Sequence, residues 1–246
     1  MKFHQSKAPS AFTLVELLVC IAIIAVLAAL MLGPISKVKS KAKGVQCMNN
    51  LHQLGIGIQT FIAENHAYPS FISGTNGNNP GTWESQLERG GFDISKPKKL
   101  FFAEGVWLCP SARWKAEDWK NGSIPSCYGY NTYGVGGGGH TNALGLQGRL
   151  VSMSDLFAPI GESEVVSPGE MMAIGDSIVG GVLFTRQPFS YLDQKGRASS
   201  RHQGKLNVVF CDGHVESPTL KFLFEDTSDE ALRRWNRDHQ PHRERR

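Results

Sequence analysis

The N-terminal part of the chain is dominated by one long apolar stretch. Residues 12–32 are 21 residues with a single charged side chain, Glu16. Because an α-helix rises about 1.5 Å per residue, a helix over this stretch would be about 31 Å long, which matches the hydrocarbon core of a bilayer. The apolar region of a secretory signal peptide is shorter, at about 7 to 15 residues. We therefore expect residues 12–34 to form one transmembrane helix.

Helical periodicity continues beyond this stretch. We expect a kink at the Gly33-Pro34 pair, because proline has no amide hydrogen to donate. Apolar residues then recur in steps of three and four, which is the period of a helix; they are Ile35, Val38, Ala42, Val45, Met48, Leu51, Leu54, Ile58, Phe61 and Ile62. We predict one helix of 52 residues over 12–63, whose part within 35–66 packs its apolar stripe against a globular domain. Asn65 and Pro69 are expected to end it.

Residues 67–232 have the pattern of a β-rich globular domain. Short apolar runs alternate with Gly, Pro, Asn and Ser, which are strand and turn signals. Residues 206–210, followed by Asp212-Gly213 and residues 214–216, predict a β-hairpin with a type I′ turn, because Asp-Gly suits the positive φ angles of that turn. The expected fold class is therefore α+β, with one long N-terminal helix packed on a small antiparallel β-sheet domain.

The basic residues are concentrated at the C-terminus. The formal net charge is +4, and residues 233–246, with six Arg against Asp238 and Glu244, carry that value alone. The body has no basic excess, so a nucleic-acid-binding groove is not expected there. We interpret residues 233–246 as a solvated or frayed basic tail.

Four cysteines follow the apolar stretch, which itself contains Cys20. The four are Cys47, Cys109, Cys127 and Cys211. In an oxidising compartment they allow two disulfides in any of three pairings. Four buried free thiols are equally compatible with the sequence.

The junction between the polar leader and the apolar stretch resembles a known motif. The residues Ala11-Phe12-Thr13-Leu14-Val15-Glu16-Leu17-Leu18 are similar to the G-F-T-L-I-E-L-L type motif of type IV prepilins. This resemblance implies that prepilin peptidase removes residues 1–11 by cleaving between Ala11 and Phe12 and that Phe12 is then methylated. It also implies that Glu16 pairs with the N-terminal amine of a neighbouring subunit. Ala11 departs from the glycine of the family pattern.

A second resemblance covers most of the body. The segment GVQCMNNLHQLGIGIQTFIAENHAYP and the spacing His202-x(9)-Asp212-Gly213 are similar to a large family of bacterial prepilin-like proteins with a C-terminal H-x(9)-D-G signature. Cys109-Pro110 and Tyr130-Asn131 also fit this family. We expect His202, Asp212 and Gly213 to have a structural role, with the aspartate and the glycine shaping a turn.

Together the resemblances imply a pilin-like fold and a non-enzymatic, structural subunit similar to the major pseudopilins of type II secretion. The implied location is the bacterial inner membrane, crossed once, with the N-terminus cytoplasmic and the body periplasmic. The implied partners are prepilin peptidase, other pilin-like subunits, an inner-membrane assembly platform and the lipid bilayer. No cofactor is expected. Charge alone favours the opposite orientation, because Lys2 and Lys7 precede the stretch whereas four lysines over residues 37–43 follow it.

Two other functions stay open at this point. In one, the helix tethers an extracytoplasmic metal-binding module or hydrolase, and His202, Asp212 and His214 gather around a divalent metal. Gly175-Asp176-Ser177 also has a weak resemblance to a serine esterase block. In the other, the chain is a minor or DNA-uptake pilin, and the basic tail of residues 233–246 contacts nucleic acid.

Overall fold

The computed structural model describes residues 12–70, 82–91, 105–112, 127–136, 143–152, 156–177 and 201–245, without the side chains of residues 31–34, 36 and 150–157. The chain divides into two compact units, Met1–Ala42 and Lys43–Arg246. The predicted leader, residues 1–11, lies outside the described residues. The same holds for Ala11 at the predicted cleavage junction.

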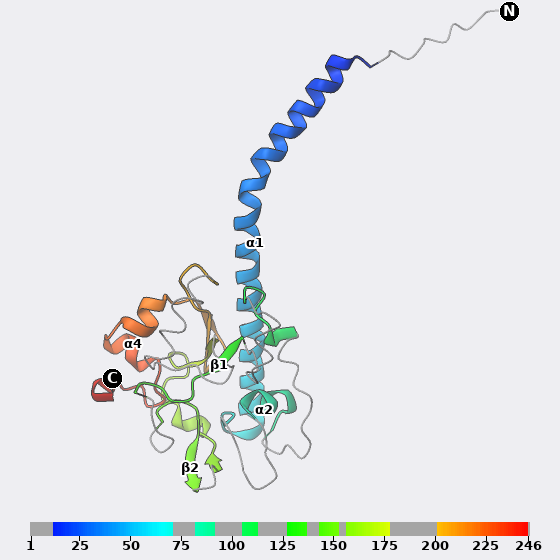
Figure 1. Ribbon diagram of the computed structural model, residues 1–246. Coiled ribbons are helices and arrows are strands. Elements are labelled where there is room, and N and C mark those ends of the chain that lie inside the picture. The colour runs from blue at the N-terminus through cyan, green and yellow to red at the C-terminus, as the bar shows by residue number, and fades with distance from the viewer. Residues whose placement is uncertain are drawn as a thin grey trace, which may run out of the picture. The chain divides into compact units, whose positions relative to one another are not determined.

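One long helix opens the described chain. Helix α1 is Leu14–Asn65 and has 52 residues, so the predicted helix is confirmed in length, with each end shifted by two residues (Figure 1). It continues through the Gly33-Pro34 pair. At its end, Asn65 donates from Nδ2 to the carbonyl of Phe61 at 2.8 Å, and His66 adopts a positive φ of 52°. A residue in this left-handed conformation commonly closes a helix.

The described side chains of the first unit are all exposed in the single chain. Among them, Phe12 is 68% exposed, Leu14 74% and Leu30 69%. Over the described part of the chain, we find no helix with the length and apolar character needed to cross a membrane. The predicted transmembrane segment, residues 12–34, runs into the gap in described side chains at residues 31–34.

Among the described side chains of α1, those of the apolar stripe that are buried all lie in the second unit. Its buried members there are Cys47, Leu51, Leu54, Ile58, Phe61 and Ile62. Ile35, Val38 and Val45 were predicted to belong to the same packed stripe, but they are 56%, 64% and 67% exposed. That part of the prediction is wrong, because helical periodicity identifies an apolar face without showing what covers it.

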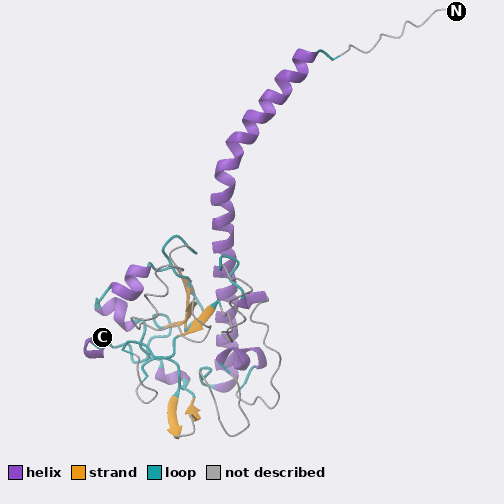
Figure 2. Ribbon diagram, viewed as in Figure 1, coloured by secondary structure: helices purple, strands orange, loops and turns teal. Residues whose placement is uncertain are grey.

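A four-stranded antiparallel sheet forms the centre of the second unit, as predicted (Figure 2). Its strand order is β1-β4-β5-β6, with β1 at Tyr128–Tyr130, β4 at Met172–Asp176, β5 at Val208–Phe210 and β6 at Val215–Glu216. A separate antiparallel pair consists of β2 (Arg149–Ser152) and β3 (Leu156–Ala158). The other helical segments of the described residues are short; they are α2 (Trp83–Arg89), η1 (Gly105–Trp107), η3 (Glu162–Glu164), η4 (Lys221–Glu225), α4 (Asp229–Arg233) and η5 (Arg243–Arg245).

The sheet is buried on both faces. Along β5, Val209 belongs to a core cluster that includes the second half of α1, whereas Val208 and Phe210 belong to another cluster with Leu232 and Trp235. Successive residues of a strand point to opposite faces, so β5 contributes to both clusters. This explains why its sequence is continuously apolar, as strands covered on both faces are.

The predicted hairpin joins β5 to β6, but its turn differs from the prediction. The amide of Phe210 donates to the carbonyl of His214 at 2.9 Å, and the amide of Gly213 donates to the carbonyl of Phe210 at 2.9 Å. The loop therefore has three residues, 211–213, and only Gly213 among them has a positive φ, of 93°. A type I′ turn needs two such residues, so that prediction is wrong. A three-residue loop with glycine in the left-handed region is a common alternative.

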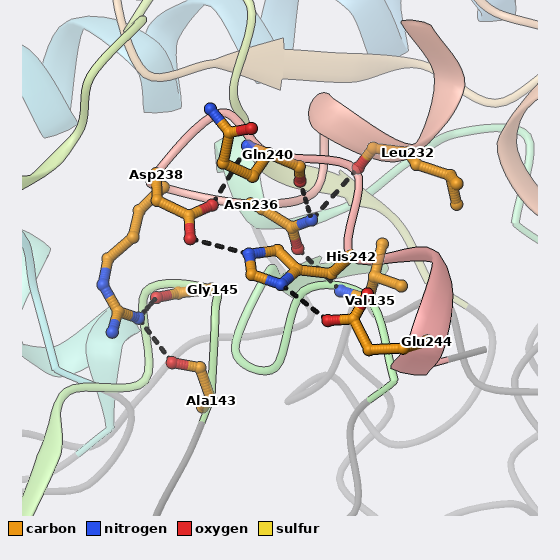
Figure 3. A network of polar contacts seen from close by, with 10 residues as sticks. Val135, Ala143, Gly145, Leu232, Asn236, Asp238, Gln240, His242 and Glu244 are labelled. Atoms are coloured by element: carbon orange, nitrogen blue, oxygen red, sulfur yellow. Dashed lines mark hydrogen bonds and ion pairs between the residues drawn. The ribbon is translucent and has the colours of Figure 1, made fainter. Parts of the chain in front are cut away.

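The C-terminal segment is packed against other parts of the second unit, which corrects the prediction of a frayed tail (Figure 3). The guanidinium of Arg237 donates to the carbonyls of Ala143 and Gly145, the latter at 3.0 Å. Asn236 accepts from the amide of Val135 at 2.9 Å. Trp235 is completely buried. Net charge predicts solvation only where the charged groups have no internal partners, and here backbone carbonyls satisfy the arginine.

Candidate functional site

Side-chain hydrogen bonds cap the start of α1. Glu16 Oε2 accepts hydrogen bonds from the amide and the hydroxyl of Thr13, both at 2.8 Å, and Thr13 Oγ1 accepts from the amide of Glu16 at 3.3 Å. This reciprocal arrangement is a capping box, which satisfies amides that the first turn of a helix leaves unpaired. The sequence interpretation missed it, although the spacing T-x-x-E before an apolar run is its known signal.

The capping box places the predicted processing residue at the edge of regular structure. Phe12 immediately precedes Thr13, and its side chain is 68% exposed. Glu16 is one turn further along, where a negative charge is favoured by the helix dipole. The position predicted for cleavage and the carboxylate predicted for assembly therefore lie at the same end of α1.

The Asp-Gly part of the C-terminal signature packs the hairpin loop closely on α1. A Cβ atom added to Gly55 would lie 2.7 Å from Val209 Cγ2 and 2.8 Å from the carbonyl oxygen of Gly213. The side-chain amide of Gln59 donates to the carbonyl of Cys211. Only a residue without a side chain fits this approach of helix and loop, so Gly55 and Gly213 have complementary roles in packing.

Asp212 and His214 interact with each other in this loop. Asp212 Oδ1 accepts from the amide of His214 at 3.1 Å and lies 2.6 Å from its Nδ1. The ring of His214 stacks on Phe210, with centroids 4.3 Å apart. These contacts fit the structural role predicted for the signature.

His202 does not come together with these two residues, so the structure does not form the metal group of His202, Asp212 and His214 that the sequence left open. The side chain of His202 is only 6% exposed, and its Nε2 lies 3.2 Å from Asp176 Oδ2 and 3.6 Å from Cys109 Sγ. Of the residues with described side chains, the His, Cys, Asp and Glu that come close enough to share an ion are Cys47, Cys109 and His202. Spacing along the chain gave no sign of this group, whose members come from distant segments.

One disulfide joins α1 to the segment after η1. It links Cys47 to Cys109, which are 62 residues apart, with a Cα–Cα distance of 5.0 Å. In the chain-entropy model, a loop of this length gives about 4 kcal/mol of stabilisation. Cys127 and Cys211 are buried thiols outside the disulfide, whereas Cys20 is an exposed thiol. Burial raises the pKa of the Cys211 thiol well above its usual range, so this cysteine is a poor nucleophile and a poor metal ligand.

The contacts of His202 do not have the geometry of a catalytic triad. In a triad, the histidine contacts the nucleophile and the carboxylate through different ring nitrogens. Here Nε2 contacts both Cys109 and Asp176, and Cys109 is in the disulfide. Ser177, from the esterase-like block, is completely buried, and its amide donates to the carbonyl of Cys127 at 2.9 Å. This arrangement gives no support to the hydrolase hypothesis.

A family description identifies the N-terminal segment. The family model described as "prokaryotic N-terminal methylation motif" matches residues 7–32, which include Ala11, Phe12 and Glu16. No curated protein and no solved structure matches the chain. The matched residues end well before His202, so the resemblance to the H-x(9)-D-G family stays a prediction. The N-terminal segment of this chain therefore carries a prepilin-type cleavage and methylation motif.

Proposed function

We propose that this chain is a non-enzymatic subunit of a pilus-like filament, such as the pseudopilus of type II secretion. The observation that carries the proposal is the methylation motif at residues 7–32, located at the start of a 52-residue helix. The described side chains from Phe12 to Leu30 are exposed, and most of them are apolar. An apolar surface of this extent is typical of segments covered by lipid or by other helices.

In this proposal, residues 12–32 serve first as the membrane anchor and later as the core of the filament. The stretch has the length of a bilayer span in sequence, with Glu16 as its only charge. Packing of identical stretches side by side would cover the same apolar surface after the subunit leaves the bilayer. Head-to-tail contacts of this kind are heterologous and produce open helical assemblies.

Glu16 would set the register of this assembly. A carboxylate inside a membrane helix costs about 2.5 to 3.5 kcal/mol on insertion scales, so a charged partner is favoured. Removal of the leader would create a positively charged amine on Phe12, near the end of α1 that carries Glu16. In the single chain, Glu16 Oε2 accepts hydrogen bonds from the amide and the hydroxyl of Thr13. We expect the amine of a neighbouring Phe12 to pair with this carboxylate on assembly, because both charges then leave water together.

The second unit would face the periplasm, with the leader in the cytoplasm. The Cys47–Cys109 disulfide supports this orientation, because disulfides persist in oxidising compartments. The lysines that follow the apolar stretch favour the opposite orientation. We give the disulfide more weight, since it belongs to the folded unit and the lysines lie on a helix that continues away from the stretch.

An assembly assay with two glutamate variants tests the proposal. Glu16→Ala should be processed normally but should give at least about tenfold less sheared filament than the wild type. The control is Glu64→Ala, which removes an exposed carboxylate near the other end of α1 and should leave filament yield unchanged. Equal filament yield from both variants would contradict the role of Glu16. Absence of filaments from the wild type in a host with the complete assembly machinery would instead support a tethered module.

A further inference from the structure

We propose that Cys47, Cys109, His202 and Asp176 form a zinc site when the Cys47–Cys109 disulfide is reduced. Helix α1 and the segment after η1 would then be cross-linked in either of two ways, by a disulfide or by a metal ion. This inference concerns the second unit alone and does not depend on filament assembly.

The four side chains come from four separate elements of the second unit. Cys47 is on α1, Cys109 is two residues beyond η1, His202 is in the turn before β5, and Asp176 is the last residue of β4. The two sulfurs and a ring nitrogen of His202 all lie within 4.8 Å of one another. Asp176 is outside this group and contacts it through His202, with Oδ2 at 3.2 Å from Nε2. The fold therefore brings two sulfurs and one nitrogen to one place, with a carboxylate beside the nitrogen.

The distances suit tetrahedral zinc. With Zn–S of about 2.3 Å and Zn–N or Zn–O of about 2.0 Å, neighbouring sulfur and nitrogen ligands are about 3.6 Å apart and nitrogen and oxygen ligands about 3.3 Å. The separation of Cys109 Sγ and His202 Nε2 is 3.6 Å, and that of His202 Nε2 and Asp176 Oδ2 is 3.2 Å. Two of the ligand-to-ligand distances of a tetrahedron are thus already present. Two adjustments remain: the sulfurs must separate, which cleavage of their bond permits, and Asp176, which lies outside the group that shares the 4.8 Å limit, must approach them.

Asp176 provides an independent reason to expect a cation. Its side chain is fully buried, and Oδ2 accepts from the amide of Asn207 at 2.7 Å. Within the described part of the chain, Oδ1 has no hydrogen-bond partner. A buried carboxylate with an unpaired oxygen is costly, and a cation bound at Oδ2 would offset its negative charge. Two thiolates and an imidazole favour zinc over magnesium or calcium, which prefer oxygen ligands.

The change from the disulfide to the zinc-bound state requires a reductant and releases protons. A dithiol reductant gives two electrons and two protons to the disulfide, which breaks the sulfur–sulfur bond and leaves thiols on Cys47 and Cys109 while the reductant becomes a cyclic disulfide. Binding of Zn²⁺ to both sulfurs then releases the two thiol protons to water, because the metal ligand is the thiolate. Oxidation of the two thiolates by a disulfide, which accepts the two electrons and becomes a dithiol, would re-form the Cys47–Cys109 bond and release the metal.

Cobalt(II) is a suitable probe, because its absorption reports tetrahedral thiolate ligation at zinc sites. The full chain would be purified in detergent with Cys20→Ser, which removes the exposed thiol outside the site. After reduction we expect one Co²⁺ to bind, with thiolate charge-transfer absorption that stoichiometric Zn²⁺ abolishes. The oxidised protein should show no such absorption. Reduced protein without this signal would overturn the proposal.

Two histidine variants identify the ligands. His202→Ala should weaken Co²⁺ binding by about 100-fold or more, because a direct ligand is lost. The matched control is His214→Ala, which removes a 40% exposed histidine of the β5–β6 hairpin and should leave affinity within about twofold. Equal affinity of the two variants would show that His202 is not a ligand and would overturn the site.

Loss of Co²⁺ binding in His202→Ala must be distinguished from loss of folding. Intact mass should show the Cys47–Cys109 disulfide in oxidised His202→Ala, as expected if the two segments still meet. His202→Cys replaces one zinc ligand by another and should restore Co²⁺ affinity to within about tenfold of the wild type, with stronger thiolate absorption. Failure of His202→Cys to bind when the oxidised protein contains the native disulfide would also contradict the proposal.

Discussion

The two halves of α1 have the same apolar periodicity but different surroundings. In the first unit, the described side chains of the helix are all exposed, whereas in the second unit one face of the same helix is the centre of a core cluster. Even within the second unit the two surroundings lie close together, because Val45 is 67% exposed and Leu51, fewer than two helical turns away, is completely buried. An apolar stripe therefore shows that a partner is needed, and the rest of the fold decides whether the partner belongs to the same chain.

The largest expected difference between covered and uncovered positions of α1 is in the cost of removing an apolar side chain. Leu51→Ala should lower the free energy of unfolding of the second unit by about 3 kcal/mol, because it leaves a cavity in the core. Val45→Ala should change it by less than about 0.5 kcal/mol. Denaturant unfolding of both variants in detergent measures this. A similar loss for both would mean that Val45 is also packed.

One of the buried side chains of the second unit is a carboxyl group, and this predicts that the free energy of unfolding depends on pH. Glu84 is 2% exposed, and burial raises the pKa of its carboxyl from 4.5 to about 8. The folded state thus keeps a proton on Glu84 that the unfolded state loses. The contribution of this proton to the free energy of unfolding is fully present below about pH 4.5 and is lost as the pH rises through about 8. The expected loss is about 3 kcal/mol between pH 5 and pH 8.

Glu84→Gln should remove most of this pH dependence, because the amide stays neutral over the whole range. Unfolding free energies of the variant and the wild type at several pH values provide the measurement. The control is Glu88→Gln, one turn away on α2 and exposed. If Glu84→Gln and the wild type lose stability in parallel between pH 5 and pH 8, the buried carboxyl is not the titrating group.

Two glycines of α1 test how closely the second half of the helix is covered. Gly55→Ala should lower the free energy of unfolding by about 2 kcal/mol, because the new methyl group would overlap Val209 and the Gly213 backbone. A Cβ on Gly57 would have no neighbour within 4 Å, so Gly57→Ala should stabilise the helix by about 0.5 to 1 kcal/mol. Opposite signs are expected; a gain for Gly55→Ala would contradict the close approach of the hairpin loop.

Local patterns were sufficient to predict the main elements. The period of apolar residues indicated the length of α1, and the Asp-Gly pair indicated the β5–β6 hairpin. The T-x-x-E spacing would also have predicted the capping box of Thr13 and Glu16. These features depend on residues that are close in sequence, which is why short-range reasoning applies to them.

The surroundings of His202 could not be predicted in this way. Cys109 is 93 residues away in sequence and Asp176 is 26, and neither spacing is typical of a metal or catalytic motif. The packing of Arg237 was equally hidden, because its partners are backbone carbonyls that leave no mark in the sequence. Long-range contacts such as these follow from how the sheet and α1 assemble, and composition does not encode them.

The N-terminal residue of the mature protein tests the central claim most directly. Intact mass and N-terminal sequencing would be compared for protein from membranes of a host with prepilin peptidase and of the same host without it. The account predicts a start at methylated Phe12 with the peptidase and at Met1 without it, and Ala11→Arg should block cleavage while Ala8→Arg should not. An uncut chain beginning at Met1 in both hosts would contradict processing as a prepilin, and with it the proposed filament subunit.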